Sequence, residues 1–354
     1  MTKQRLILFF DGTWNDPEDQ TNVFRIAQRI HEYDGDVRQR FFYDPGVGNG
    51  KFDRFMGGIF GYGLSKNLLQ GYKWLAKRYT DEDEIWIFGF SRGAYTARSL
   101  VGLIRKCGLL HIVTPGLLEK AEHIYRDKNL KPDDEECETF KRNYSRTPRV
   151  HFIGVWDTVG ALGVPGTNLS EHGKYAWHDT ELSGAVDYAY HAVALDEHRS
   201  AYDVPLWISE DGLKKAKNRD VEQRWFIGAH ANVGGGYGAK DLLADIPLQW
   251  MVEKASSAGL KLDTFQTADN AWQTEPRDSF SEFLRGAYAW VRKFRSSGDG
   301  RYFRHFAKGL KGKPAVNVTV DPSVWKRWEA PESTYRPRTL TDAQQSPPEQ
   351  NDRD

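Results

Sequence analysis

Residues 89–93 read GFSRG, in which a serine has a glycine two positions away on each side. The preceding IWIF is typical of a buried strand, and the following AYTARSLVGLIRK has helical spacing. In such a strand–turn–helix connection, Gly89 and Gly93 allow a sharp turn that holds the serine hydroxyl at the start of the helix. The pattern makes Ser91 a candidate nucleophile. The alternative is an ordinary turn in which Ser91 only caps the helix.

A serine hydroxyl becomes a good nucleophile only when a neighbouring base takes its proton, and histidine is the usual base. Among the ten histidines, His230 is the best placed, because it follows the strand-like RWFIGA and precedes the glycine-rich NVGGGYG. It would then emerge at the same sheet edge as Ser91, with the histidine last in the chain. The alternative is a loop histidine that only makes hydrogen bonds.

An acid is needed to orient the histidine. Asp157 is favoured, because it directly follows the strand-like VHFIGVW and would lie at the same sheet edge. Asp196 is the alternative acid and lies nearer to His230 in sequence. The stretch around it is expected to be helical, where Asp196 and Arg199 would form an ion pair at i,i+3 spacing. Asp245, on a later helix, is a third and weaker choice.

Backbone N–H groups must stabilise the oxyanion that forms when a serine attacks an ester. One donor is expected to be the N–H of Arg92, the residue after the nucleophile. The second should come from the loop after an early strand, which the stretch FFDGTWND supplies, with Gly12 or Thr13 as the donor. This chemistry uses only protein groups, so no metal and no cofactor are expected.

Short apolar runs alternate with helical stretches along the chain, as in a parallel sheet with crossover helices. The predicted fold class is therefore α/β, with a mainly parallel central sheet and helices on both faces. The expected strands are RLILFFDG, RQRFFYDPGVG, EIWIFGFS, RVHFIGVWDTVG and QRWFIGAHANVGGG, and the expected helices are TNVFRIAQRIHEY, GYGLSKNLLQGYKWLAKRYT, the stretch after Ser91, and 241–259.

We expect residues 1–340 to form a single domain. Within it, 111–148 is predicted to be a helical insertion that caps the site, and 263–330 an irregular aromatic and basic extension. Residues 341–354 belong to a proline-rich, polar end and are expected to form a disordered tail.

The 354 residues include 49 basic and 49 acidic side chains, so the formal net charge is zero and no nucleic-acid partner is expected. No apolar run approaches the roughly 20 residues of a spanning helix. The first apolar run is too short for a signal peptide. The two cysteines, Cys107 and Cys137, have neither metal-ligand nor redox spacing. We expect a protein that is cytoplasmic as made.

Two other enzyme classes share fragments of these motifs. The stretch FFDGT resembles the D-x-D-G-T motif of haloacid-dehalogenase-type phosphatases, but Phe9 stands where the aspartate nucleophile would be. The stretch PGVGNGK does not have P-loop spacing, and Phe52 replaces the required hydroxyl residue. Both readings are therefore disfavoured.

The chain carries FFDGTWN, GFSRGAYTAR, GVWDTVGALG, ALDEHR and WFIGAHANVGGGY in this order. With these motifs it resembles a large α/β-hydrolase family that includes the phospholipase effectors of the bacterial type VI secretion system. The resemblance implies an α/β-hydrolase fold with Ser91 as nucleophile and His230 as base, and it leaves Asp157 and Asp196 open as the acid. It also implies export without a cleavable signal peptide, with a secretion-system or immunity protein as partner.

These observations predict a serine hydrolase that cleaves carboxylic esters through an acyl-enzyme, as a lipase or phospholipase. A simpler esterase fits the same residues. The basic stretch 292–313 is suited to anionic headgroups, which favours peripheral membrane contact. The alternative from another class is a non-catalytic module that binds a lipid or a partner on the same fold.

Overall fold

A central sheet positions the three candidate catalytic residues, Ser91, Asp157 and His230. In the computed structural model, its strands are β1 (Gln4–Phe10), β2 (Tyr33–Asp34), β3 (Val37–Asp44), β4 (Glu84–Phe90), β7 (Val150–Trp156), β8 (Val186–Ala194), β9 (Asp220–Phe226) and β10 (Val318–Val320). The short strands β5 (Leu109–Leu110) and β6 (Ser145–Arg146) pair separately. The described residues are 3–12, 19–46, 59–160, 181–209, 211–238, 241–282, 299–309 and 312–348.

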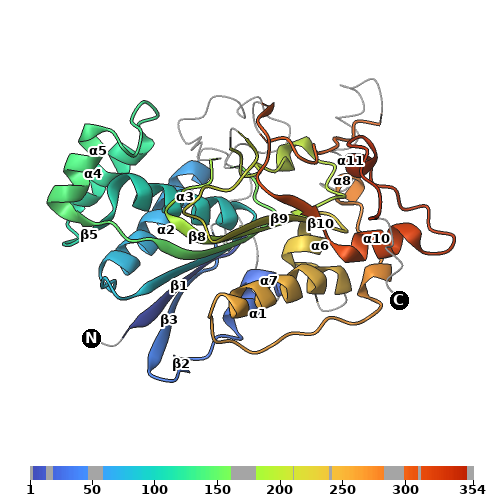
Figure 1. The fold of residues 1–354 in the computed structure, drawn as a ribbon, viewed down its shortest axis with the longest axis horizontal. Helices are drawn as coiled ribbons and strands as arrows, with labels where there is room; N and C mark the ends of the chain where they lie inside the picture. Colours follow the sequence, from blue (N-terminus) through green and yellow to red (C-terminus); the bar gives the residue numbers. More distant parts are fainter. Residues whose placement is uncertain are drawn as a thin grey trace.

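The central sheet has the order β10-β9-β8-β7-β4-β1-β3-β2 (Figure 1). Its neighbouring strands are parallel, except for the antiparallel β2–β3 pair at one edge. Because parallel strands end at one edge of the sheet, the loops that follow β1, β4, β7 and β9 come together there. The predicted α/β class and its mainly parallel sheet are confirmed.

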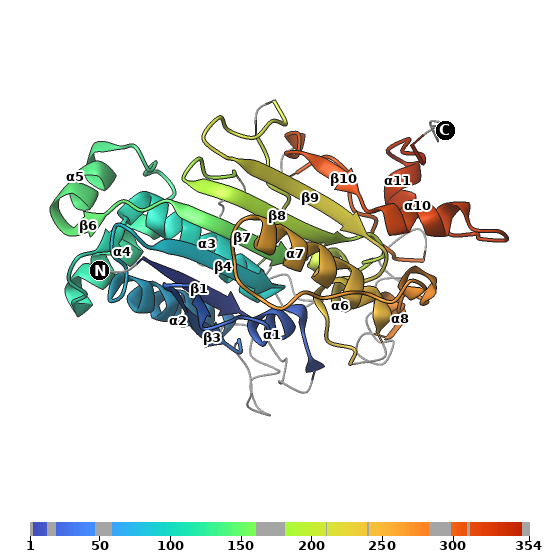
Figure 2. The ribbon, with the colours of Figure 1, turned by 60° about the horizontal axis from the view of Figure 1, so that its bottom comes forward.

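Helices cover both faces of the sheet. They are α1 (Asn22–Ala27), α2 (Ile59–Ala76), α3 (Arg92–Cys107), α4 (Pro115–Arg126), α5 (Glu135–Tyr144), α6 (His230–Gly234), α7 (Asp245–Ser257), α8 (Ser279–Glu282), α10 (Pro322–Glu329) and α11 (Arg338–Thr341). Figure 1 shows α2 and α3 on one face and α1 and α7 on the other, and Figure 2 shows α7 in front of the sheet. None of the helices in the described ranges is long and apolar enough to cross a membrane.

Alternate residues of β1 divide between the two faces, as expected of a strand covered on both sides. Leu6, Leu8 and Phe10 pack in the cluster formed with α2 and α3, whereas Ile7 and Phe9 pack in the cluster formed with α1 and α7. All five side chains are buried, with at most 1% of their surface exposed. Burying apolar area on both faces fixes the register of the central strands.

Two parallel strands of the central sheet, β8 and β10, lie outside the sequence prediction. The sequence pattern predicts a helix around Asp196, but β8 ends at Ala194 and Asp196 follows it in a loop. The residues of VDYAYHAVA form a central strand and are almost all buried, on both faces of the sheet. Contacts with the neighbouring strands therefore outweigh the mixed helix and strand propensities of these residues. The strand β10 pairs in parallel with β9, so the extension expected to be irregular adds an edge to the sheet.

The predicted insertion contains α4 and α5, which pack against α3 through Leu118, Ala121, Ile124 and Phe140. At the other end of the chain, α10 and α11 bury Val324 and Leu340 against the ends of β8 and β9. The expected disordered tail begins where α11 ends, and the described chain continues to 348.

Helix α3 crosses β1 at very close range. A Cβ atom at Gly93, in the first turn of α3, would overlap the backbone carbonyl oxygens of Phe10 and Asp11. Backbone atoms cannot rotate away as a flexible side chain could, so only glycine fits. The absence of a side chain at Gly93 thus sets the distance between the start of α3 and the end of β1.

We expect the substitution Gly93→Ala to lower the free energy of unfolding by about 3 kcal/mol or more, because overpacking here forces the backbone apart. Urea unfolding followed by circular dichroism measures the loss. The matched control is Gly116→Ala in α4, where an added Cβ meets nothing within 4 Å. Equal stability of the two variants would contradict the close-approach argument.

Candidate active site

Ser91 occupies the tight turn between β4 and α3. Its backbone has φ 58° and ψ −124°, a conformation that non-glycine residues rarely adopt. A Cβ at Gly89 would lie 2.6 Å from the carbonyl oxygen of Gly93 and 2.7 Å from the Cα of Ala94. The Ser91 side chain makes no capping hydrogen bond to α3. The strained backbone therefore holds the hydroxyl away from the helix it precedes.

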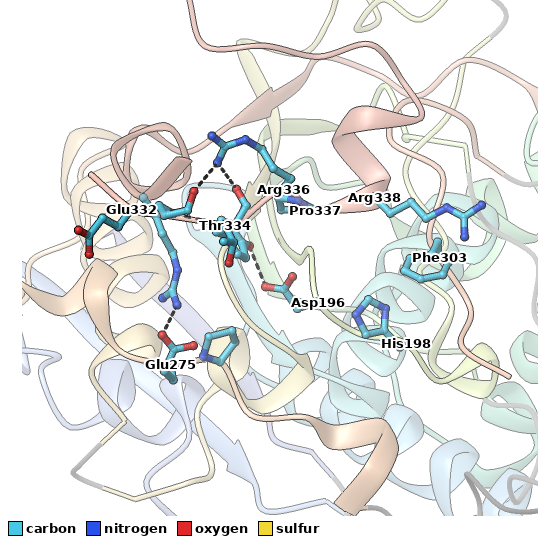
Figure 3. Close-up of a pocket in the computed structure, with 13 residues that line it drawn as sticks. Asp196, His198, Glu275, Phe303, Glu332, Thr334, Arg336, Pro337 and Arg338 are labelled. Carbon is cyan, nitrogen blue, oxygen red and sulfur yellow. Dashed lines mark hydrogen bonds and ion pairs between the residues drawn. The ribbon is translucent and has the colours of Figure 1, made fainter. Parts of the chain in front are cut away.

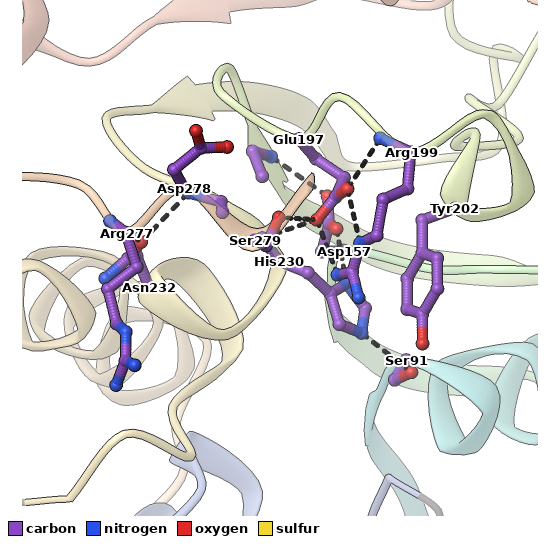
Figure 4. Close-up of polar contacts among 12 residues, drawn as sticks. Ser91, Asp157, Glu197, Arg199, Tyr202, His230, Asn232, Arg277, Asp278 and Ser279 are labelled. Atoms are coloured by element: carbon purple, nitrogen blue, oxygen red, sulfur yellow. Dashed lines mark hydrogen bonds and ion pairs between the residues drawn. The ribbon is translucent and has the colours of Figure 1, made fainter. Parts of the chain in front are cut away.

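His230 begins α6, directly after β9, and its ring lies between two polar side chains (Figure 4). Its Nε2 is 2.8 Å from the Oγ of Ser91, and its Nδ1 is 2.6 Å from Oδ2 of Asp157. The Nδ1–H tautomer satisfies both contacts, donating to Asp157 and accepting from the Ser91 hydroxyl. The rings of Phe90 and Tyr202 pack around His230 at centroid distances of 4.7 and 5.0 Å.

Asp157 follows β7 and is completely buried. Its Oδ1 accepts the backbone N–H of Ala194 at 2.9 Å, and Arg304 donates to both of its carboxylate oxygens, at 2.6 and 3.0 Å. Burial by itself raises the pKa of Asp157, but the positive charge of Arg304 and the bond from His230 outweigh it and lower the pKa below its ordinary value. The carboxylate is therefore ionised in the resting protein.

The pKa of His230 is lowered, because burial disfavours the imidazolium form more than the Asp157 carboxylate favours it. A lowered pKa keeps the ring neutral at neutral pH. A neutral ring with its Nε2 facing a hydroxyl can accept that proton, so the three side chains have the geometry of a nucleophile, a base and an orienting acid.

A second buried ion pair lies beside His230. Glu197 has no exposed surface, and Arg199 donates to both of its carboxylate oxygens, at 2.8 and 2.7 Å. The same carboxylate accepts the backbone N–H of His230 at 3.3 Å and the hydroxyl of Ser279 at 3.0 Å. The Arg199 guanidinium stacks 3.7 Å from the ring centroid of Tyr202. The prediction that Arg199 pairs with Asp196 at helical spacing is thus wrong, because residues 195–199 form a loop.

Asp196 makes its hydrogen bonds with residues other than His230. Its Oδ2 accepts the backbone N–H of Gly228 at 2.7 Å and the hydroxyl of Tyr335 at 2.8 Å. With His198 and Tyr335 it lines a pocket of about 550 Å³ that includes none of Ser91, Asp157 and His230 (Figure 3). Asp245, the third candidate, pairs with Arg25 at 2.6 Å. Of the three candidate acids, only Asp157 contacts the ring of His230.

The expected oxyanion donors lie on two elements. Arg92 is the first residue of α3, next to Ser91. The N–H of Gly12 donates to Oδ1 of Asp11 at 2.7 Å, while Oδ2 of Asp11 accepts hydroxyl hydrogen bonds from Thr21 and Tyr43, each at 2.6 Å. Thr13 lies outside the described residues. The loop after β1 is therefore anchored beside the start of α3, and the oxyanion role of its N–H groups stays a prediction.

Sequence reasoning missed Arg304 and Glu197, and it paired Arg199 with the wrong carboxylate. Arg304 lies in a basic stretch that reads as a surface segment, and the motif ALDEHR contains Glu197 and Arg199 without indicating which carboxylate the arginine binds. Charged residues are rarely buried unless paired. The pairing depends on loops that come together only in the folded chain.

Residues 4–254 match the family described as the Tle1-like phospholipase effector of the type VI secretion system, catalytic domain. The chain is also 28% identical, over 225 residues, to the uncharacterized protein YEL023C of Saccharomyces cerevisiae. That alignment covers 56% of this chain and 32% of the yeast protein, so it takes in about a third of that relative.

Two solved structures are similar at low identity. A crystal structure of an uncharacterized protein from Pseudomonas aeruginosa has 19% identity and a TM-score of 0.47, covering 84% of this chain and 52% of that one. The Tle1 effector bound to the VgrG spike of the type VI secretion system has 18% identity and a TM-score of 0.36, covering 67% and 51%. The chain spans about half the length of each.

We expect Glu197→Gln to destabilise the fold by about 3–5 kcal/mol, because the buried guanidinium of Arg199 loses its counter-charge. Urea unfolding measures the change. The control is Glu32→Gln, since Glu32 pairs with Arg38 at the surface, where the two side chains are 61% and 41% exposed. That loss should stay below about 1 kcal/mol. A loss equally small for Glu197→Gln would show that the buried pair is dispensable.

Proposed function

The chain belongs to the Tle1-like family of type VI secretion phospholipase effectors, and from this membership we propose that it hydrolyses carboxylic esters of phospholipids, with Ser91 as the nucleophile. The observation that carries the proposal is the hydrogen-bonded chain from Ser91 through His230 to Asp157, built on a strained strand–turn–helix connection. An N-cap serine or a loop histidine would need neither the strain nor the buried carboxylate.

In the proposed reaction, the Ser91 Oγ attacks the ester carbonyl carbon while its proton passes to Nε2 of His230. The N–H of Arg92 stabilises the oxyanion of the tetrahedral intermediate together with an N–H from the loop after β1. For the Gly12 N–H to take this role, it would have to leave Oδ1 of Asp11. As the intermediate collapses, His230 returns the proton to the departing alcohol, leaving an acyl-enzyme. Water, deprotonated by His230, then attacks the acyl carbon; the bond to the Ser91 Oγ breaks, His230 returns the proton to this oxygen, and the fatty acid leaves. Asp157 holds the tautomer and stabilises the imidazolium that forms in each step.

We propose that residues 1–340 act as one catalytic unit, because side chains beyond 254 complete the site. Arg304 contacts Asp157, and Ser279 contacts Glu197 beside His230. A phospholipid substrate requires contact with a membrane surface, and the family indicates delivery by a secretion system whose components would be the protein's partners.

The first test is hydrolysis of phosphatidylethanolamine and phosphatidylglycerol vesicles beside short-chain p-nitrophenyl esters, comparing the parent with Ser91→Ala. We expect fatty-acid release from vesicles that falls by about 10⁴-fold or more in the variant, because the nucleophile is lost. Circular dichroism checks that the variant is folded.

Other outcomes separate the rivals. Serine-dependent activity on soluble esters alone would make the protein an esterase and remove the phospholipid from the proposal. If no substrate is hydrolysed and the fluorophosphonate does not label Ser91, the hydrolase proposal is overturned and a binding module is favoured.

A second test compares the two candidate acids as matched substitutions. Asp157→Asn should lower kcat by about 10⁴-fold, because the amide stabilises the wrong tautomer of His230. Asp196→Asn should leave kcat per folded molecule near that of the parent, since its contacts are with Gly228 and Tyr335. Activity is normalised by fluorophosphonate titration of the parent and by the folded fraction of each variant. The reverse ranking would reassign the acid.

A further inference from the structure

Arg304 is the most deeply buried cation next to the reacting groups. Its side chain is 1% exposed, and it donates to both oxygens of Asp157 and to the backbone carbonyl oxygens of Ala194 and Tyr202. Its Nε has no hydrogen-bond partner among the described residues. The two terminal nitrogens of the guanidinium therefore bind the Asp157 carboxylate and the two backbone carbonyl groups.

A buried ion pair is a weak way to stabilise a fold, because desolvation of both charges offsets most of their attraction. The position of Arg304 calls for another explanation. A bidentate guanidinium fixes the plane of a carboxylate, which lysine cannot do. Here that plane leaves Oδ2 of Asp157 directed at Nδ1 of His230, at 2.6 Å.

We infer that Arg304 is a positioning residue of the proposed triad, which orients the Asp157 carboxylate toward His230 and offsets its charge. The inference rests on the proposed function for its kinetic consequence, although the coupling of Arg304 to His230 can be measured without turnover. It also extends the site beyond the family match, because Arg304 lies 50 residues after the last matched position, 254.

The charge of Arg304 acts on the proton that His230 carries. Removing Arg304 leaves the Asp157 carboxylate unopposed, so the Asp157–His230 pair holds its proton to a higher pH, whichever of the two carries it. The other charged or titratable groups facing the pair stay in place; they are Glu197, Arg199, Tyr202 and His191. The upward shift is therefore a signature of Arg304 itself.

The test uses Arg304→Met and Arg304→Lys in the full chain. In Arg304→Met, the titration of His230, followed by NMR of ring-labelled histidine, should move up by about one pH unit or more. The acid limb of kcat/KM on a soluble ester should move with it. We expect kcat to fall on the order of 10²-fold, the cost of misplacing a catalytic group by about 1 Å, with little change in KM.

Arg304→Lys keeps the charge and loses the fork, so its His230 titration should stay near that of the parent while kcat falls on the order of tenfold. If the methionine variant does not fold, the lysine variant carries the test. Arg301→Met is the matched control, because Arg301 lies on the same segment but pairs with Asp278. It removes one positive charge and should shift neither the titration nor kcat.

The outcomes separate the two proposals. In one outcome, the parent hydrolyses no ester but the His230 titration of Arg304→Met lies above that of the parent. This result would support the role of Arg304 and overturn the hydrolase. An active parent whose folded Arg304→Met variant keeps the parental titration and kcat would overturn the role of Arg304 and leave the hydrolase intact.

Discussion

A carboxylate removed from water is stable in its charged form only where opposite charge and hydrogen bonds replace its hydration. Asp157 meets that condition with the bidentate Arg304, the N–H of Ala194 and the ring of His230. The groups come from the end of β8, from the start of α6 after β9, and from the segment 299–309. The sheet order β9-β8-β7 brings these elements to one place, so the burial of this single charge depends on the whole topology.

The nucleophile side of the site depends on a different constraint, close backbone approach. Ser91 can hold φ 58° only because its surroundings fix the turn, with its N–H donating to the carbonyl of Trp156 at 3.1 Å. Gly93 lets α3 start directly against the carboxyl end of β1. The same contact holds the loop at Gly12 next to the start of α3. Strain at one residue is thus supported by packing at residues from three strands.

The sequence was most informative where one physical rule decided the outcome. Parallel strands end at one edge, so residues just past the apolar runs of β4, β7 and β9 had to be neighbours, and Ser91, Asp157 and His230 are. It was least informative about β8, whose burial comes from neighbouring strands and not from its own pattern. The buried arginines were equally hidden, because a charge in a loop gives no periodic signal and its partner is chosen only by the tertiary fold.

The charges around the imidazole explain why burial wins over the nearby carboxylate in setting its pKa. Asp157 is matched by Arg304, and Glu197 is matched by Arg199, so the ring lies among two pairs with no net charge. In such surroundings the imidazolium gains less from the two carboxylates than burial costs it, and the neutral base is the resting form. In the proposed reaction, the charge that appears on His230 is balanced by the oxyanion that forms at the same time. The Asp157 carboxylate and the oxyanion together thus stabilise the charged imidazole while a substrate is reacting.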